Sequence, residues 1–185
     1  MSTTRFIVIV LLSCYSALLP AQDSTVYRTE SLADINLRFE LPQQTWSKAN
    51  VTKAKNDDKI YTYTRKLFEG AKKKGEATFS IFVEKVKPST SIKDYSLKNL
   101  AFFKQQKNFQ IKKAFTDSDG RFTLPYTIGY DASYEDAKGV KHHLYILHTI
   151  EFNHAAQLLI DFPFDQQDLY EEEQTQVIKS LRYER

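Results

Sequence analysis

The sequence has few of the residues that cross-link a chain or break its regular structure. Of 185 residues, five are glycine, five are proline and one is cysteine. The scarcity of glycine and proline excludes a low-complexity or linker-rich chain. No stretch reaches the ~20 consecutive apolar residues that a membrane-spanning helix needs. We therefore expect no transmembrane segment, and one domain, since domains usually hold ~100–200 residues.

The first 22 residues are typical of a secretory signal peptide. Met1–Arg5 carries one positive charge, Phe6–Ser13 is apolar, and small residues in Ala17–Ala21 precede the polar Gln22. This order of basic, apolar and small-residue regions directs export and ends at a cleavage site, here after Ala21 or Gln22. We expect residues 1–22 to be a signal peptide and residues 23–185 to form a single domain of a secreted or periplasmic protein.

The single cysteine leaves an alternative open. Leu11-Leu12-Ser13-Cys14 resembles a bacterial lipobox, in which the cysteine is lipidated and becomes the first residue of the mature protein. However, Leu12 stands where a small residue is usual, and the residues after Cys14 are apolar, whereas a lipoprotein tether normally begins polar. Cleavage near Ala21–Gln22 is the favoured interpretation, and a membrane-anchored lipoprotein is the alternative.

Cleavage after Gln22 also defines the charge of the mature chain. It removes Arg5 from the 26 basic residues, so 25 basic and 23 acidic residues remain and the net charge is +2. This charge is too small to argue for nucleic acid or an anionic membrane as a partner. The mature chain contains no cysteine, so it has no disulfide and must be held together by an apolar core.

Alternating apolar residues predict a sheet, and two amphipathic segments predict helices. The predicted strands include Ile35–Leu41, Ile60–Phe68, Ala77–Val86, Phe109–Phe115 and Phe122–Tyr134. The predicted helices are Ile92–Gln106, which starts at a capping box of Ser91 and Asp94, and about Gln166–Leu181. Because the order is strands, helix, strands, helix with short connections, the fold class is α+β, an antiparallel β-sheet flanked by helices.

A β-hairpin over Val140–Phe162 is the most regular part of this pattern. The even positions from Val140 to Phe152 are mostly apolar, as are alternate positions from Ala156 to Phe162. A three-residue loop at Asn153-His154-Ala155 would put these two apolar sets on one face. We therefore expect Ile150 to pair with Leu158 and Ile146 to pair with Phe162, with His148 opposite Ile160.

The order of elements resembles a known family. Phe39-Glu40-Leu41-Pro42 followed by Trp46 is similar to the opening of PsbP-like proteins, which include extrinsic subunits of the photosynthetic oxygen-evolving complex and non-photosynthetic bacterial relatives. The likeness continues through Ile60–Val86, the helix after Pro88, and the helix that ends in Ile178-Lys179-Ser180-Leu181. It implies a secreted or lipid-anchored α/β/α sandwich that acts as an accessory or binding module without enzymatic activity.

No catalytic, cofactor-binding or metal-ligating residue stands out. His142 and His148 share a strand face but lie ~20 Å apart at ~3.3 Å per residue, while the adjacent His142 and His143 point to opposite faces. His148 is best interpreted as a hydrogen-bonded core histidine. The sequence also lacks a nucleophile elbow and a phosphate-binding glycine loop. We therefore assign no site residues and no cofactor, and expect the protein not to be an enzyme.

Three surface features are candidates for binding sites. Lys72–Lys74 is most simply a solvated hairpin tip, and Glu171–Glu173 a solvated helix face. Tyrosines that could line an amphipathic surface, but more often pack across strands, are Tyr61, Tyr63, Tyr126, Tyr130, Tyr134 and Tyr145. The leading hypothesis is a non-catalytic module that binds an envelope protein or glycan. The alternative is a carrier of a small apolar or amphipathic ligand held between the sheet and Ile92–Gln106.

Overall fold

The computed structural model describes residues 25–53, 58–66 and 76–184. The predicted signal peptide, including Cys14, and the basic segment Lys72–Lys74 lie outside these residues, so the expectations for them stay predictions. None of the described helices is both long and apolar enough to cross a membrane.

The described residues form ten strands and two α-helices. The strands are β1 (Tyr27–Leu32), β2 (Leu37–Pro42), β3 (Asn50–Lys53), β4 (Lys59–Thr64), β5 (Thr78–Lys85), β6 (Gln110–Thr116), β7 (Thr127–Glu135), β8 (Lys141–Glu151), β9 (His154–Pro163) and β10 (Arg182–Tyr183). The helices are α1 (Ile92–Phe103) and α2 (Gln167–Ser180), and two 3-10 turns are η2 (Asp117–Asp119) and η3 (Phe164–Gln166). The predicted elements are present, but β7 begins at Thr127 and not at Phe122, and the strands β1 and β10 were not predicted.

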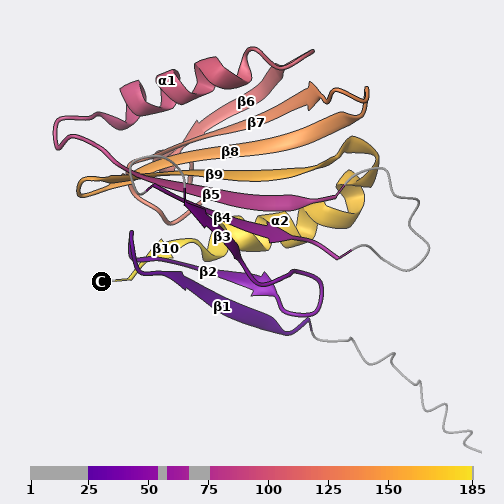
Figure 1. Cartoon of the computed structure of the whole chain (residues 1–185), viewed down its shortest axis with the longest axis horizontal. Helices are drawn as coiled ribbons and strands as arrows, with labels where there is room; N and C mark the ends of the chain where they lie inside the picture. Colours follow the sequence, from indigo (N-terminus) through magenta and orange to yellow (C-terminus); the bar gives the residue numbers. More distant parts are fainter. Residues whose placement is uncertain (1–24, 54–57, 67–75, 185) are drawn as a thin grey trace, which may run out of the picture.

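The elements are arranged in three layers (Figure 1). The central layer is a seven-stranded antiparallel sheet in the order β3-β4-β5-β9-β8-β7-β6. Helix α1 covers β7 and β8 on one face of this sheet. On the other face lie α2 and a three-stranded sheet of order β1-β2-β10, with α2 packed against β2 and β9. This is the expected α+β class, with helices on both sides of an antiparallel sheet and a second, small sheet in addition.

The register of the β8–β9 hairpin differs from the predicted one. The strands are joined by a two-residue turn, Phe152-Asn153, so Ile150 lies opposite Ala155 and Ile146 opposite Leu159. The predicted partners, Leu158 and Phe162, lie instead opposite Leu147 and His143. The prediction was wrong because it assumed that only one face of the hairpin is buried.

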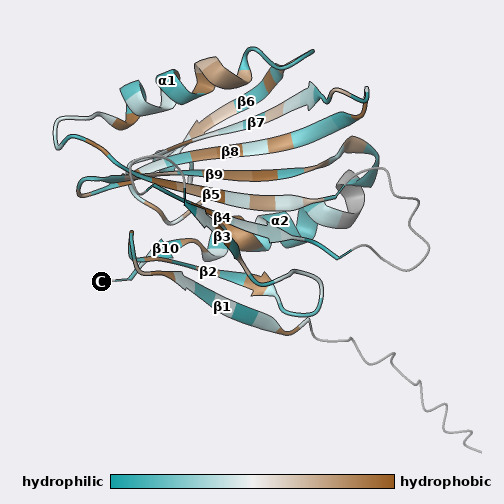
Figure 2. Ribbon diagram, in the orientation of Figure 1, coloured by the Kyte–Doolittle hydropathy of each residue, from teal (hydrophilic) through white to brown (hydrophobic). Residues whose placement is uncertain are grey.

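Both faces of this hairpin are covered. The even positions of β8 face α1, whereas the odd positions face α2 and the small sheet together with alternate residues of β9. That second face carries the main core, which includes Leu147, Leu158, Ile160 and Phe162 against Phe39 of β2. Apolar residues accordingly run through the central strands β5, β9 and β8 in Figure 2.

The start of α1 is determined locally, as the sequence predicts. Ser91 is the N-cap, and its hydroxyl accepts a hydrogen bond from the Asp94 amide at 3.1 Å and donates one to the Asp94 carboxylate at 2.7 Å. This arrangement satisfies an amide that the first helical turn leaves free. The helix then buries Tyr95, Ser96, Leu100 and Phe103 against the sheet.

A buried ion pair fastens α2 to the edge of the core. Arg65, only 2% exposed, donates two hydrogen bonds to Glu173 of α2, at 2.9 and 2.8 Å. The indole of Trp46 donates a third to the same carboxylate at 3.0 Å, and the Arg65 guanidinium lies over the ring of Tyr170. Glu173 is therefore not the solvated residue that the run Glu171–Glu173 suggested.

We expect Glu173→Gln to lower the free energy of unfolding by about 2 kcal/mol, because it leaves a buried guanidinium without the carboxylate that accepts from it twice. Urea denaturation measures this change. Glu172→Gln, at an exposed neighbouring position on α2, is the matched control and should stay within about 0.5 kcal/mol of the original protein. Equal stabilities of the two variants would contradict a stabilising role for this contact.

Candidate functional site

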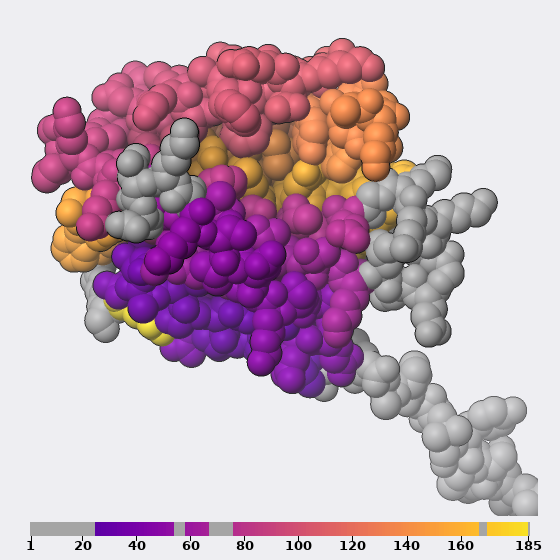
Figure 3. Space-filling model, viewed as in Figure 1, coloured from indigo at the N-terminus to yellow at the C-terminus, as the bar shows by residue number. Residues whose placement is uncertain are grey.

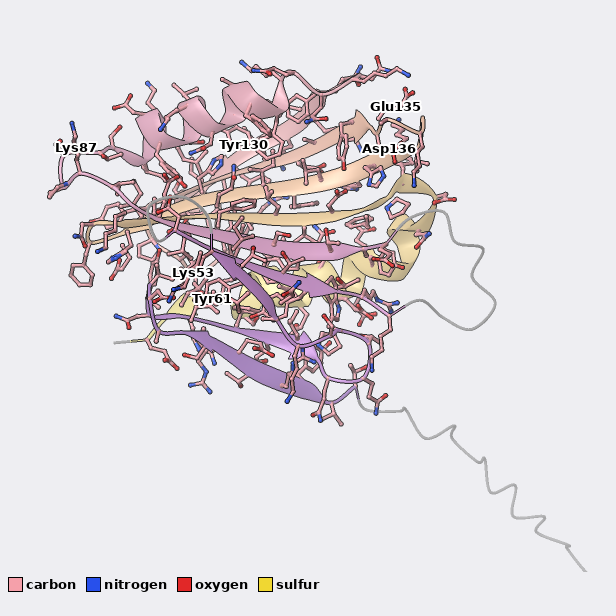
Figure 4. The ribbon with its side chains drawn as sticks, in the orientation of Figure 1. Lys53, Tyr61, Lys87, Tyr130, Glu135 and Asp136 are labelled. Atoms are coloured by element: carbon pink, nitrogen blue, oxygen red, sulfur yellow. The ribbon has the colours of Figure 1, made fainter. Side chains whose placement is uncertain are left out.

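A hollow lies where four chain segments meet at one end of the sheets. Its volume is about 860 Å³. It is lined by the β5–α1 loop, the loop before β7, the β8–β9 turn and β10, and its lining residues include Ile92, Pro125, Tyr126, Phe152 and Tyr183. We call this hollow the aromatic cleft. The β5–α1 loop and the β8–β9 turn project together at this end in Figure 1, and Lys87 marks the loop in Figure 4.

Two exposed aromatic residues on the cleft have an unfavourable backbone conformation. Tyr126 has φ 50° and is 67% exposed, and Phe152 has φ 53° and is 83% exposed. A bulky side chain in the left-handed region is a conformational outlier, because its Cβ crowds the backbone. Such outliers persist only where the surrounding structure imposes them, and they cluster at binding sites.

The surroundings hold both residues in place. The backbone amide of Tyr126 donates to the Asp117 carboxylate of η2 at 2.8 Å. Beside Phe152, the carbonyl of Asn153 accepts a hydrogen bond from the Val86 amide at 2.9 Å, which joins the turn to the end of β5. The cleft is therefore a constrained surface that presents two aromatic rings to solvent.

The floor of the cleft is tied to the C-terminal strand. The hydroxyls of Thr149 and Tyr183 are 2.7 Å apart, and Thr149 also donates to the carbonyl of Pro125 at 3.4 Å. Burial raises the pKa of Tyr183 to about 12, so the phenol stays protonated and available for this contact. Strand β10, which sequence patterning did not reveal, thus completes one wall.

The six tyrosines that could have lined one amphipathic binding surface do not lie on one surface. Tyr63 and Tyr130 are buried, at 0% and 8% exposure, and they face opposite sides of the large sheet. Tyr134 donates a hydrogen bond to Asp161 at 2.7 Å and stacks on His142, and Tyr61 donates to Asp34. Packing is the correct interpretation for these, whereas Tyr126 belongs to the cleft.

The histidines are engaged in separate contacts. His148 is fully buried beneath α1; its Nδ1 lies 3.0 Å from the Ser96 hydroxyl and its Nε2 2.9 Å from the Gln157 amide. This confirms the hydrogen-bonded core histidine, although its cross-strand partner is Gln157, not Ile160. The Ser96 hydroxyl also contacts that of Tyr130, labelled beneath α1 in Figure 4.

His142 and His143 point to opposite faces of β8, as predicted. His142 lies 2.8 Å from Asp161 and 3.7 Å from Asp136, on the α1 side. His143 lies 2.8 Å from Asp131, between the rings of Tyr145 and Phe162. Across the described residues, no three or more histidine, cysteine or acidic side chains are grouped so that they could hold a metal ion.

Side chains occupy the interface that the carrier hypothesis assigned to a ligand. Leu100 and Phe103 of α1 pack on Tyr130, Leu144 and Ile146 of the sheet. A pocket of about 240 Å³ lies beside the end of α1, where Phe103 and Gln106 face β5 and β9. In Figure 3 this side shows a depression between α1 and the strands β4 and β5.

Comparison with known proteins identifies the fold. No protein-family model and no characterised protein matches the sequence. The solved structures that are similar to the chain in fold include three with TM-scores above 0.5. The protein of unknown function PA94 from Pseudomonas aeruginosa has 13% identity and TM-score 0.53, over 86% of this chain and 98% of that one. Cyanobacterial PsbP from Synechocystis sp. PCC 6803 has 10% identity and TM-score 0.57, over 89% and 96%.

The third similar structure is the Ran-binding protein Mog1p from Saccharomyces cerevisiae. It has 6% identity and TM-score 0.52, over 86% of this chain and 96% of that one. The likeness to cyanobacterial PsbP confirms the PsbP-like fold that the sequence pattern indicated. At these identities the likeness concerns the fold alone.

Two buried histidines, His148 and His142, give pH dependences of opposite sign. Burial lowers the pKa of His148 from 6.5 to about 4. As pH falls from about 6.5 to 4, the unfolded chain therefore binds a proton at this histidine that the folded protein does not, and the free energy of unfolding falls by up to ~3 kcal/mol. The hydrogen bond to Asp161 raises the pKa of His142, so its contribution is present below 6.5 and is lost as pH rises.

We therefore expect His148→Gln to flatten the fall in stability between pH 7 and pH 4, measured by urea denaturation at each pH. The matched variant His142→Gln should lose more stability at pH 5 than at pH 8. If both variants keep the pH profile of the original protein, neither histidine contributes as described.

Proposed function

We propose that this protein is an exported, non-catalytic binding module whose aromatic cleft docks a protein partner in the cell envelope. The observation that carries the proposal is the presentation of Tyr126 and Phe152 on one hollow, both highly exposed and both in a strained backbone conformation. Exposed apolar side chains that gather on one surface mark interaction sites, and aromatic residues are enriched at protein interfaces.

The composition of the cleft favours a protein partner. Apolar side chains of Ile92, Pro125 and Ile150 lie beside the two aromatic rings, and Glu151 and Arg182 add one charge of each sign. An apolar centre with a polar rim is the usual arrangement of a protein interface. The Ran-binding protein Mog1p, which is similar in fold, offers a precedent for protein binding by this architecture.

Glycine variants separate binding from folding. We expect Tyr126→Gly and Phe152→Gly to abolish partner binding and to keep the free energy of unfolding within about 1 kcal/mol, because relief of left-handed strain offsets the greater freedom of the unfolded chain. Asn36→Gly is the matched control, since Asn36 also has a positive φ, of 50°, but does not line the cleft. This control should keep both binding and stability.

Photo-crosslinking in the intact envelope identifies the partner and its site. A benzoylphenylalanine at position 152 should give a polypeptide adduct, and the same residue at Phe102, which is 64% exposed on α1, should not. Adducts of equal yield from both positions would contradict docking at the cleft. A carbohydrate adduct would show that the partner is a glycan and not a protein.

Export is the second part of the proposal, and it rests on the N-terminal sequence. We expect the intact mass of the protein taken from its native envelope to correspond to a chain that starts at Gln22 or Asp23, because Ala17–Ala21 supplies the small residues that cleavage requires. A mass for an acylated chain starting at Cys14 would establish the lipoprotein alternative instead. A chain retaining Met1–Gln22 would overturn export by a cleaved signal.

A further inference from the structure

We propose that a second hollow, between α2 and the β6–η2 segment, binds a small anionic molecule with a flat apolar body, such as an aromatic carboxylate. We call it the α2 pocket; its volume is about 300 Å³. The lining residues that carry the argument are Phe115, Arg121, Tyr145, Gln174, Ile178 and Lys179. The pocket does not share residues with the aromatic cleft, so the proposal stands independently of the function proposed above.

The floor of the α2 pocket is apolar and ordered by packing. Phe115 and Ile178 are 3% and 7% exposed, and the ring centroids of Phe115 and Tyr145 are 6.2 Å apart. Phe115 lies directly against the backbone of Gly129, where a Cβ would come within 2.3 Å of the ring. The planes of these two rings are tilted by 49°, so a flat apolar molecule can stack on one ring and meet the other at an angle.

The rim is basic. Arg121 holds its guanidinium 5.0 Å from the centroid of the Phe115 ring, and Lys179 lies in the last turn of α2. Among the described residues, neither Arg121 nor Lys179 forms an ion pair with an acidic side chain. Two cations on the rim of one apolar hollow favour a ligand that carries a negative charge at one end.

Polar groups inside the pocket can orient such a ligand. Gln174 is only 5% exposed, yet it lines the hollow. It lies close enough to the Tyr145 hydroxyl to lower its pKa, against the dominant effect of burial, which raises that pKa. The acidic groups that act on Tyr145 are Asp131, which is paired with His143, and Glu171, which does not line the pocket. The negative end is therefore expected at the rim and the apolar body at the floor.

The test uses 2-naphthoate as probe and its neutral analogue 2-naphthamide as comparison, with binding followed by titration calorimetry and by the NMR signals of Tyr145. We expect 2-naphthoate to bind, and Arg121→Gln and Lys179→Gln each to weaken binding roughly five- to tenfold. Lys98→Gln, at an exposed position on α1, is the matched control and should leave the affinity unchanged.

A steric variant locates the site. Thr175 is exposed on α2 at the mouth of the pocket, so Thr175→Trp should block the probe without disturbing the core. Equal affinities for 2-naphthoate and 2-naphthamide, or unchanged binding in Thr175→Trp, would overturn the proposal, as would the absence of binding at millimolar probe. Phe152→Gly should bind 2-naphthoate normally. A failure of partner docking at the aromatic cleft can therefore be distinguished from a failure of ligand binding in the α2 pocket.

Discussion

The pairing of β8 with β9 decides which side chains of the central hairpin face α1 and which face α2 and the small sheet. Because partners in an antiparallel pair share a face, the two-residue turn at Phe152-Asn153 determines which side chains of the hairpin lie together. The face toward α1 carries His142, Leu144, Ile146 and His148. The face toward α2 and the small sheet carries Leu147, Leu158 and Phe162. A shift by one residue would exchange the faces of one strand. The turn therefore has two roles: it sets the register of the central hairpin, and it exposes Phe152 in the strained conformation that marks the aromatic cleft.

Local signals in the sequence predicted the elements well and their pairing poorly. Ser91 and Asp94 mark the start of α1, and the alternation from Ala77 to Val83 gives the buried face of β5, because both effects act within a few residues. The hairpin register depends on which face is buried, and here both are, so a period of two no longer selects one alignment. Position 152 also holds phenylalanine, and not the glycine or asparagine that usually indicates such a turn, so the alternation of apolar residues predicts that it belongs to the strand.

The candidate site was harder to predict than the fold, because its parts are distant in the sequence. Ile92, Tyr126, Phe152 and Tyr183 come from four segments, and only their arrangement in space makes a hollow. Tyr126 is one of six tyrosines within predicted strands, and no sequence signal separates it from the buried Tyr63 and Tyr130. A positive φ at an aromatic residue has no signature in composition or periodicity, so the strain could be found only in the structure.

The interior and the surface of the molecule use polar groups in different ways. Inside, both nitrogens of His148, both oxygens of Asp161 and both oxygens of Glu173 are occupied by other residues of the chain. Such groups hold the layers together, since a buried polar group without a partner would be destabilising. The aromatic cleft and the α2 pocket differ from these networks: the rings of Tyr126 and Phe152 are open to solvent, as are the side chains of Arg121 and Lys179. Because binding energy comes from groups that a ligand can still satisfy or cover, the two hollows, and not the histidine and carboxylate clusters, are where we place the interactions of this protein.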